Sequence, residues 1–400
     1  MLTSLSLIFL VGLAMGAICS KLKLPRIIGM LATGIILGPY VLDLLDPSIL
    51  SISAELRKMA LVIILLKAGL SLNLQDLKKV GRPAIMLSFV PATFEIIGYI
   101  LLAPVILGLT HTEAAVMGVV LSAVSPAVVI PRMVQLMDSQ YGTDQAIPQM
   151  IMAGASCDDI FVIVLFTTFL SMAQGGGINL TSFLNIPISI ILGILLGAIV
   201  GYGLYLFFET AYARKHYVRN SMKVIIVLGF SFLLIAIEGW LESKIAISGL
   251  LAVVSMACVL KVKSIAFVSK RLSEKFGKLW LAAEVMLFVL VGAAVDIRYT
   301  LEAGFAAILM IFAALLFRTV GVLLCTFKTR LSVKERLFCV IAYLPKATVQ
   351  AAIGSVPLAA GLPCGKIILS VAVMAIIITA PLGALGMDAT YKKLLSHAES

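Results

Sequence analysis

Two adjacent aspartates, Asp158 and Asp159, lie in an otherwise apolar stretch, residues 147–171, that is long enough to cross a bilayer. A carboxylate at membrane depth costs at least about 2.5–3.5 kcal/mol on insertion scales, so a pair of them needs a reason. Burial and a neighbouring like charge favour the protonated acid, and a small hard cation competes for the same oxygens. The pair therefore predicts a site that holds a proton or a cation. The alternative is a structural ion pair for one aspartate, with the other reaching the membrane surface.

Five other ionisable side chains lie inside apolar stretches: Lys67, Glu95, Glu284, Arg318 and Lys346. A buried guanidinium without a partner would be very costly, so Glu95 and Arg318 are natural partners, which leaves the aspartates without an arginine. Lys346 follows a proline, and its ammonium is expected to offset the negative C-terminal dipole of a preceding half-helix. Lys67 is expected in a structural pair or at an interface, and Glu284 near the cytoplasmic surface.

The composition predicts a membrane protein with many spans. Of the 400 residues, 61% are hydrophobic and 13% are charged, and the mean hydropathy is +1.12. Soluble domains average about 45–50% apolar and about 25% charged residues. The net charge of +11 comes largely from basic residues in short loops, which indicates membrane topology and not nucleic-acid binding. The six cysteines lack the spacing of a disulfide framework or a zinc site, and no cofactor is expected.

Apolar runs separated by charges, prolines or glycines predict an all-α membrane protein with thirteen transmembrane helices. A separate amphipathic helix on the cytoplasmic surface is predicted for residues 262–278, where three basic residues lie off the apolar face. The spans are predicted near 2–20, 25–42, 56–72, 82–109, 112–137, 147–172, 185–209, 221–239, 244–261, 279–296, 301–326, 334–359 and 366–387.

Basic residues gather in the loops after the first, third, seventh, ninth and eleventh predicted helices and in the tail after the last. Loops rich in lysine and arginine stay in the cytoplasm, so the N-terminus is expected outside and the C-terminus in the cytoplasm. An odd number of spans requires the two termini to lie on opposite sides, so the count and the loop charges agree.

Six helices, a linker helix and six more helices form two halves of opposite topology, a pattern common among secondary transporters. The fifth helix of each half carries proline in mid-span, at Ser125-Pro126 and at Pro345-Lys346. Proline leaves carbonyls unpaired, and in hydrocarbon these must face protein, water or an ion. The sequence thus predicts two crossed broken helices, in which Val124 and Ser125 supply carbonyl and hydroxyl ligands to a cation held by the aspartates.

Several of these segments resemble a known family over nearly the whole chain. LSAVSPAVVIPRM (121–133), AGASCDDI (153–160) and LPKATVQAAIGSVP (344–357) closely resemble motifs of sodium/proton exchangers in the cation:proton antiporter superfamily. The nearest branch is the one shared by bacterial exchangers and animal mitochondrial-type sodium/hydrogen exchanger-like proteins. Glu95 and Arg318 also match that branch, in which other members carry a lysine in place of the arginine.

The resemblance implies a homodimer in the lipid bilayer. Residues 1–80 and 215–296, the latter including the surface amphipathic helix, would form a scaffold. Residues 81–172 and 301–388 would form a mobile core that carries the ion by an elevator-like movement, and 185–209 the linker helix. Asp159 would be the central ligand of sodium or lithium, with Asp158 beside it. We expect a transporter, not an enzyme, in a bacterial inner membrane, with a role in pH homeostasis.

Two other readings of the carboxylate pair stay open. One is a potassium/proton antiporter or a sodium-coupled organic-anion carrier of similar fold. The other is an intramembrane aspartyl protease, which needs its aspartates on different helices and usually within a GxGD motif that is absent here. For an exchanger, two carboxylates favour a stoichiometry of two protons exchanged for one sodium ion. If Asp158 is held in a structural contact and takes no proton, one proton is exchanged for one sodium ion.

Overall fold

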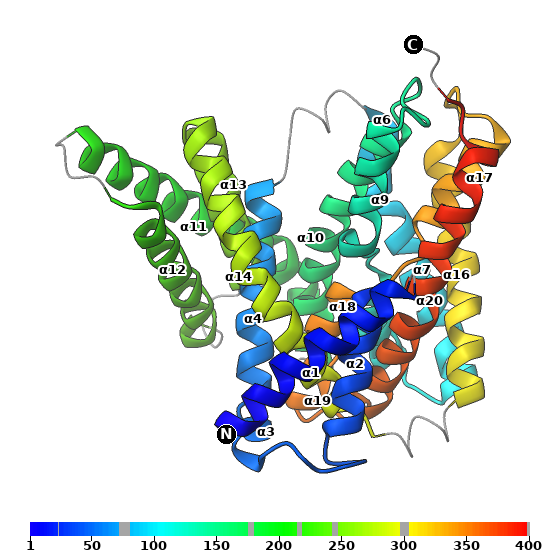
Figure 1. Ribbon diagram of the computed structural model, residues 1–400, viewed down its shortest axis with the longest axis horizontal. Coiled ribbons are helices and arrows are strands. Elements are labelled where there is room, and N and C mark those ends of the chain that lie inside the picture. Colours follow the sequence, from blue (N-terminus) through cyan, green and yellow to red (C-terminus); the bar gives the residue numbers. More distant parts are fainter. Residues whose placement is uncertain are drawn as a thin grey trace. The chain divides into compact units, whose positions relative to one another are not determined.

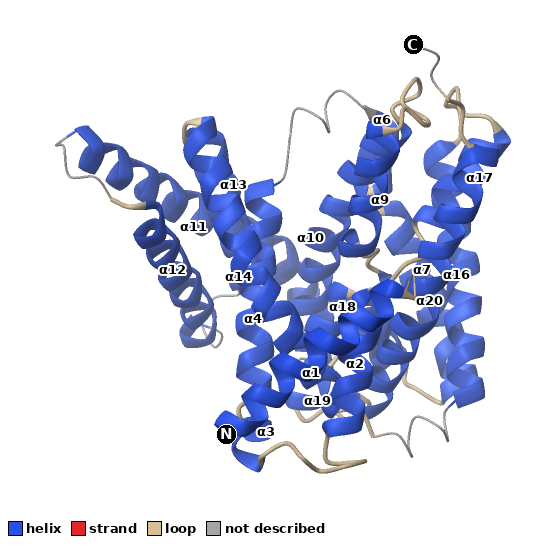
Figure 2. Ribbon diagram, viewed as in Figure 1, coloured by secondary structure: helices blue, strands red, loops and turns tan. Residues whose placement is uncertain are grey.

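The computed structural model describes residues 1–22, 24–71, 81–174, 180–213, 218–241, 247–296 and 304–397. This part of the chain is all-α, as predicted, and within it no strand is present, only an isolated bridge between Tyr141 and His397 (Figure 2). The helices (Figure 1) are α1 (Leu2–Lys21), α2 (Arg26–Leu37), α3 (Pro47–Ser51), α4 (Ser53–Ser71), α6 (Arg82–Leu87), α7 (Val90–Leu107), α8 (His111–Ser122), α9 (Pro126–Asp138), α10 (Ile147–Ala173), α11 (Leu180–Ala213), α12 (Asn220–Leu241), α13 (Gly249–Lys263), α14 (Ala266–Ala293), α16 (Gly304–Thr326), α17 (Val333–Ala342), α18 (Thr348–Ile353), α19 (Val356–Ala359) and α20 (Gly365–Leu394).

Nine helical segments of the described chain are long and apolar enough to cross a membrane. Two of them, Arg82–Leu107 and His111–Asp138, each combine two consecutive helices, and two shorter apolar helices occur at Arg26–Leu37 and Thr348–Ala359. A chain with this many apolar helices is a multi-pass membrane protein. Every predicted span overlaps at least one observed helix, while the count of thirteen crossings stays a prediction.

The separate surface helix predicted at 262–278 is wrong. That segment instead enters α14, which runs without interruption from Ala266 to Ala293. Leu272 and Phe276, on the apolar face of this segment, are buried within the protein. Basic residues on one side of a helix therefore did not mark a separate element here, because the apolar side continues into the following span.

Both predicted broken helices are present. The span predicted at 112–137 divides into α8 and α9, with extended backbone at Ala123 and Ser125 between them. The span predicted at 334–359 divides at residues 343–347, which lie between α17 and α18. In both cases a proline, Pro126 or Pro345, lies at the interruption, where its missing N–H does not break a helical hydrogen bond.

The chain divides into two compact units, each considered by itself. Unit 1 comprises Met1–Arg57, Asn73–Val162 and Val285–Ser400, and unit 2 comprises Lys58–Leu72 and Ile163–Glu284. In unit 1, α7 packs against α8 and α16, and in unit 2, α11 packs against α13. The expected division into scaffold and core is a different grouping and stays a prediction.

Small residues allow α7 to lie close to both of its neighbours in unit 1. A Cβ at Gly118 of α8 would lie 3.2 Å from the backbone of Ile96, and one at Gly321 of α16 would lie 2.8 Å from the Cα of Pro91. Side chains at these positions would separate the helices. The close packing brings Glu95 of α7 next to Arg318 of α16, where both are buried.

Candidate functional site

The two interrupted segments meet inside unit 1. The backbone N–H of Ser125, in the α8–α9 interruption, donates a hydrogen bond of 2.8 Å to the carbonyl of Pro345, in the α17–α18 interruption. Since interrupted helices leave backbone groups unpaired, each segment here supplies a partner to the other. The site is built where they meet.

Asp158 of α10 is fully buried and is held in place from two sides. Its Oδ2 accepts a hydrogen bond of 2.8 Å from the backbone N–H of Val124 and lies 3.3 Å from Nη2 of Arg318. The expectation that the aspartates have no arginine is therefore wrong for Asp158. Arg318 reaches this carboxylate as well as Glu95, because its planar guanidinium carries several donors.

Asp159 has a different environment. It is 6% exposed, and its Oδ1 is buried with no hydrogen-bond partner within the described part of the chain. The same holds for Oδ1 of Asp158 and for the hydroxyl of Ser125. Buried oxygens of this kind are the ligands that hard cations prefer. The sequence prediction of Asp158, Asp159 and Ser125 as ligands fits this arrangement.

The predicted ion pair between Glu95 and Arg318 is present. Nη1 of Arg318 lies 2.7 Å from Oε2 of Glu95, and both side chains are buried. Arg318 also donates to the carbonyl of Ser122, the last residue of α8, and to that of Tyr343 at 2.6 Å, just after α17. Its positive charge thus lies at the negative ends of both preceding half-helices.

The structure gives the ammonium of Lys346 a partner that the sequence analysis did not name. Its Nζ lies 2.7 Å from Oε1 and 2.9 Å from Oε2 of Glu95. Arg318 occupies the position that the sequence analysis gave to Lys346. Position in the sequence shows that a cation lies near the interruption, but not which one reaches the carbonyls.

The charges of this cluster do not balance when all groups are ionised. Three carboxylates, Glu95, Asp158 and Asp159, face two cations, Arg318 and Lys346. Glu95 contacts both cations and Asp158 contacts Arg318, so the negative charge without a counter-ion falls on Asp159. One proton or one monovalent cation would neutralise it.

Among the residues that the structure describes, no group of three or more histidine, cysteine, aspartate or glutamate side chains forms a site for a tightly held metal ion. None of the six cysteines, all of which lie in the described residues, forms a disulfide. Lys67 and Glu284 both belong to unit 2, and their expected roles stay predictions.

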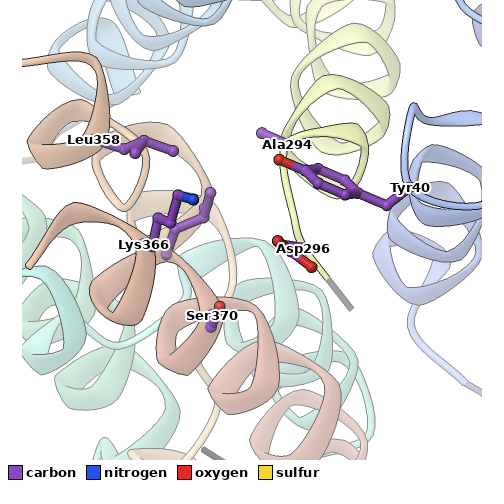
Figure 3. Close-up of a pocket in the computed structure, with 7 residues that line it drawn as sticks. Tyr40, Ala294, Asp296, Leu358, Lys366 and Ser370 are labelled. Carbon is purple, nitrogen blue, oxygen red and sulfur yellow. The ribbon is translucent and has the colours of Figure 1, made fainter. Parts of the chain in front are cut away.

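A pocket in unit 1 involves none of the predicted site residues. It is lined by the segments that follow α2 and α14 and by residues of α19 and α20, and Figure 3 shows Tyr40 on one side with Lys366 and Leu358 on the other. Its remaining lining residues are Ala294, Asp296, Leu369 and Ser370. The pocket does not include the buried carboxylates.

Sequence reasoning missed the uncharged groups of the cluster. The carbonyls of Ser122 and Tyr343 bind Arg318, and the hydroxyl of Thr379 accepts a hydrogen bond of 3.0 Å from the backbone N–H of Lys346. No residue type marks a backbone carbonyl as a ligand. For Thr379, a hydroxyl within the apolar α20 was the available signal.

Comparison with known proteins gives one consistent result. The family model described as "Sodium/hydrogen exchanger, transmembrane" matches residues 5–392. Sodium/hydrogen exchanger 9B2 of Xenopus tropicalis is 31% identical, over 99% of this chain and 75% of that protein. Its human counterpart, sodium/hydrogen exchanger 9B2 of Homo sapiens, is 32% identical over 94% and 71%.

A solved structure has a similar fold. The sodium proton antiporter MjNhaP1 from Methanocaldococcus jannaschii at pH 8 matches with a TM-score of 0.84 and 22% sequence identity, and the match covers 98% of each chain. A match of this extent shows that the helices of the two proteins follow the same path.

Proposed function

The chain belongs to the sodium/hydrogen exchanger family, and we propose that it exchanges sodium or lithium ions for protons, with Asp159 as the carboxylate that binds either one. The observation that supports this role is the charge balance of the cluster. Asp159 is the buried carboxylate left without a counter-ion by Arg318 and Lys346, and it carries an oxygen with no partner in the described chain. A site that neutralises one charge with either ion binds the two in competition.

The remaining ligands in this proposal come from the first broken helix and from Asp158. The Ser125 hydroxyl and Oδ1 of Asp158 are buried without partners among the described residues. The carbonyl of Val124 completes the proposed set, since unwound carbonyls commonly coordinate sodium in transporters. Glu95, Arg318 and Lys346 form the charge network that keeps Asp158 in place.

Alternating access in this proposal is an elevator-type movement of residues 81–172 and 301–388 relative to the scaffold of a homodimer. The N-terminus lies outside and the C-terminus in the cytoplasm, in accord with the basic loops. Both half-helix interruptions belong to the moving part, so the site would travel as one body.

The test is proton flux in proteoliposomes loaded with a pH-sensitive dye. Addition of sodium or lithium is expected to drive proton movement, whereas potassium and choline are not. Asp159→Asn is expected to abolish the flux without unfolding the protein, because an amide neither takes up the proton nor offers sodium a negative oxygen. The matched control is Asp138→Asn, an exposed aspartate at the end of α9.

Several outcomes separate the alternatives. Flux driven by potassium would identify a potassium/proton antiporter, and flux that needs an organic anion would identify a carrier. Sodium-driven flux in Asp159→Asn would show that another group carries the ion. Competition gives a second check: raising sodium is expected to move the half-maximal pH of transport to lower values, and a value unchanged over a hundredfold range of sodium would exclude a shared site.

A further inference from the structure

Gln350 of α18 is a buried side chain that links the two interrupted segments. It is 1% exposed. Its Oε1 accepts a hydrogen bond of 2.8 Å from the backbone N–H of Ala347, and its Nε2 donates one of 2.8 Å to the carbonyl of Ala123. The first bond lies within the α17–α18 interruption and the second reaches across to the α8–α9 interruption.

The orientation of this amide is fixed by its two partners. Reversing the side-chain amide would place an NH2 group against the Ala347 N–H and an oxygen against the Ala123 carbonyl, which loses both bonds. Apart from a protonated glutamic acid, only glutamine among the side chains of this length provides one acceptor and one donor without a charge. A backbone group left unpaired in a membrane interior is costly, so both bonds hold their peptide groups firmly.

The bond to Ala123 acts directly on the aspartate pair. The carbonyl of Ala123 and the N–H of Val124 belong to one planar peptide group, in which they point in opposite directions. Gln350 binds the oxygen end of this group, while its N–H end donates to Oδ2 of Asp158 at 2.8 Å. The rotation of this peptide, and with it the position of Asp158, therefore depends on Gln350.

The next peptide group is fixed in a similar way. The N–H of Ser125 donates to the carbonyl of Pro345, so the carbonyl of Val124 in the same planar group points in the opposite direction. The other end of the Pro345–Lys346 peptide is held by Thr379. Two consecutive peptides of the first interruption are thus anchored to the second, one through Gln350 and one through the backbone.

We propose that Gln350 is a positioning residue for the cation site, which fixes the Ala123–Val124 peptide and thereby presents Asp158 and the Val124 carbonyl in the geometry that binds sodium. The proposal rests on the proposed sodium/proton exchange. Gln350 does not touch the ion; it acts through the peptide that it binds. Its replacement should therefore weaken sodium binding more than it slows turnover.

Two variants test this role in proteoliposomes. Gln350→Met keeps the length and removes both hydrogen bonds, and it is expected to raise the KM for sodium at least tenfold with a smaller change in kcat. Gln350→Glu retains both bonds only when its carboxylic acid is protonated, because an ionised carboxylate has no donor for the Ala123 carbonyl. The ratio of its sodium KM to that of the wild type is expected to rise with pH. Gln135→Met and Gln135→Glu, on the exposed side of α9, are the controls.

A second measurement does not depend on transport. Sodium is expected to raise the melting temperature of the purified wild-type protein in detergent, and the increase should be smaller in Gln350→Met and, at high pH, in Gln350→Glu. If Gln350→Met does not fold, Gln350→Glu purified at acid pH gives the same comparison by titration to higher pH.

The outcomes for the two proposals differ. A wild-type protein with neither sodium-driven flux nor a sodium-dependent rise in melting temperature would overturn the proposed function, and with it the role of Gln350. The positioning role alone would be overturned by a different result. In that case the wild-type protein shows both effects, the Gln350 variants have a sodium KM within twofold of the wild-type value, and the ratio of the Gln350→Glu KM to the wild-type KM does not change with pH.

Discussion

Asp158 and Asp159 are adjacent in sequence but differ in what surrounds each side chain. Consecutive helical residues point about 100° apart, so the pair faces two environments. Asp158 is bound by Arg318 and by the Val124 N–H, whereas Asp159 has an oxygen without a partner in the described chain. In the proposed function, Asp158 therefore helps to hold the site and Asp159 exchanges the ions.

Replacing Ser125 tests its role as a sodium ligand without an expected loss of protein stability. Its hydroxyl is buried and makes no hydrogen bond within the described residues, so Ser125→Ala removes no bond and should leave the melting temperature unchanged or slightly higher. If the hydroxyl binds sodium, the KM for sodium should rise about tenfold, which corresponds to about 1.4 kcal/mol. The measurement is sodium-driven flux together with thermal unfolding in detergent.

The control for this variant is Ser231→Ala in α12. Ser231 is equally buried, but its hydroxyl already donates to the carbonyl of Val227 in its own helix. Its replacement should leave the sodium KM as it is. An unchanged KM in Ser125→Ala would remove Ser125 from the proposed ligands.

Glu95 and Arg318 are expected to be coupled in their effect on stability. Removing one member of a buried ion pair costs about 3–5 kcal/mol, because the other charge is left without its partner. Glu95→Ala also removes the ion-pair partner of Lys346, and Arg318→Ala also removes the ion-pair partner of Asp158 and the donor to two carbonyls. The double variant should lose less stability than the sum of the two single variants.

A double-mutant cycle on thermal unfolding measures this coupling. The control cycle uses Arg132 and Asp388, which pair at 3.0 Å but are 22% and 50% exposed. Exposed pairs contribute about 0–1 kcal/mol, so the control variants should have small effects. Strictly additive losses for Glu95 and Arg318 would mean that the observed contact contributes no net stability.

The charged residues of the site could be predicted from sequence because charge is rare in an apolar span. Because a buried charge without a partner is costly, the sequence predicts that Glu95 pairs with Arg318, and that pair is present. Their uncharged partners could not be predicted in the same way. Tertiary packing decides which carbonyls reach Arg318, and it pairs Lys346 with Glu95.

At the scale of elements, the prolines predicted the two helix interruptions correctly, whereas the basic residues of 262–278 predicted a helix boundary that is absent. Pro126 and Pro345 lie at the interruptions because a missing N–H and a bulky ring exclude a regular helix there. Within α14, by contrast, Lys270, Arg271 and Lys275 do not interrupt the helix. Charges on one face change what a helix contacts, but the backbone hydrogen bonds continue past them.

The packing of α11 against α13 in unit 2 depends on small residues. A Cβ added at Gly197 would lie 2.1 Å from the carbonyl oxygen of Ala252, a distance that requires the helices to move apart. Gly197→Ala is therefore expected to lower stability by about 1–3 kcal/mol, the usual cost of overpacking. Thermal unfolding in detergent measures the loss.

Gly203, six residues further along α11, provides the matched control. A Cβ there meets nothing within 4 Å. Alanine in a helix interior is more favourable than glycine by about 0.5–1 kcal/mol, so Gly203→Ala should be neutral or stabilising. Equal effects of the two substitutions would show that the close packing of α11 and α13 is not a source of stability.

At the scale of the whole molecule, the cluster bears on how much charge crosses the membrane in each cycle. Two carboxylates alone favour two protons for one sodium. The structure changes that expectation, because Asp158 is held by Arg318 and by the Val124 N–H, and an arginine does not lose its proton in proteins. If Asp158 and Arg318 keep a constant charge, the proposed exchange leaves Asp159 as the group that alternates between the two ions.

We therefore expect one proton to exchange for one sodium ion, with no net movement of charge. A membrane potential of 100 mV would bias a cycle that moves one net charge by about 2.3 kcal/mol, and would not bias this one. The measurement is the sodium gradient at which proton flux reverses, in proteoliposomes whose potential is set by a potassium gradient and a potassium ionophore. If the reversal gradient shifts with the potential, a second proton moves in each cycle. Asp158→Asn would then decide whether Asp158 carries it, because the shift should disappear in that variant if Asp158 leaves Arg318 during transport.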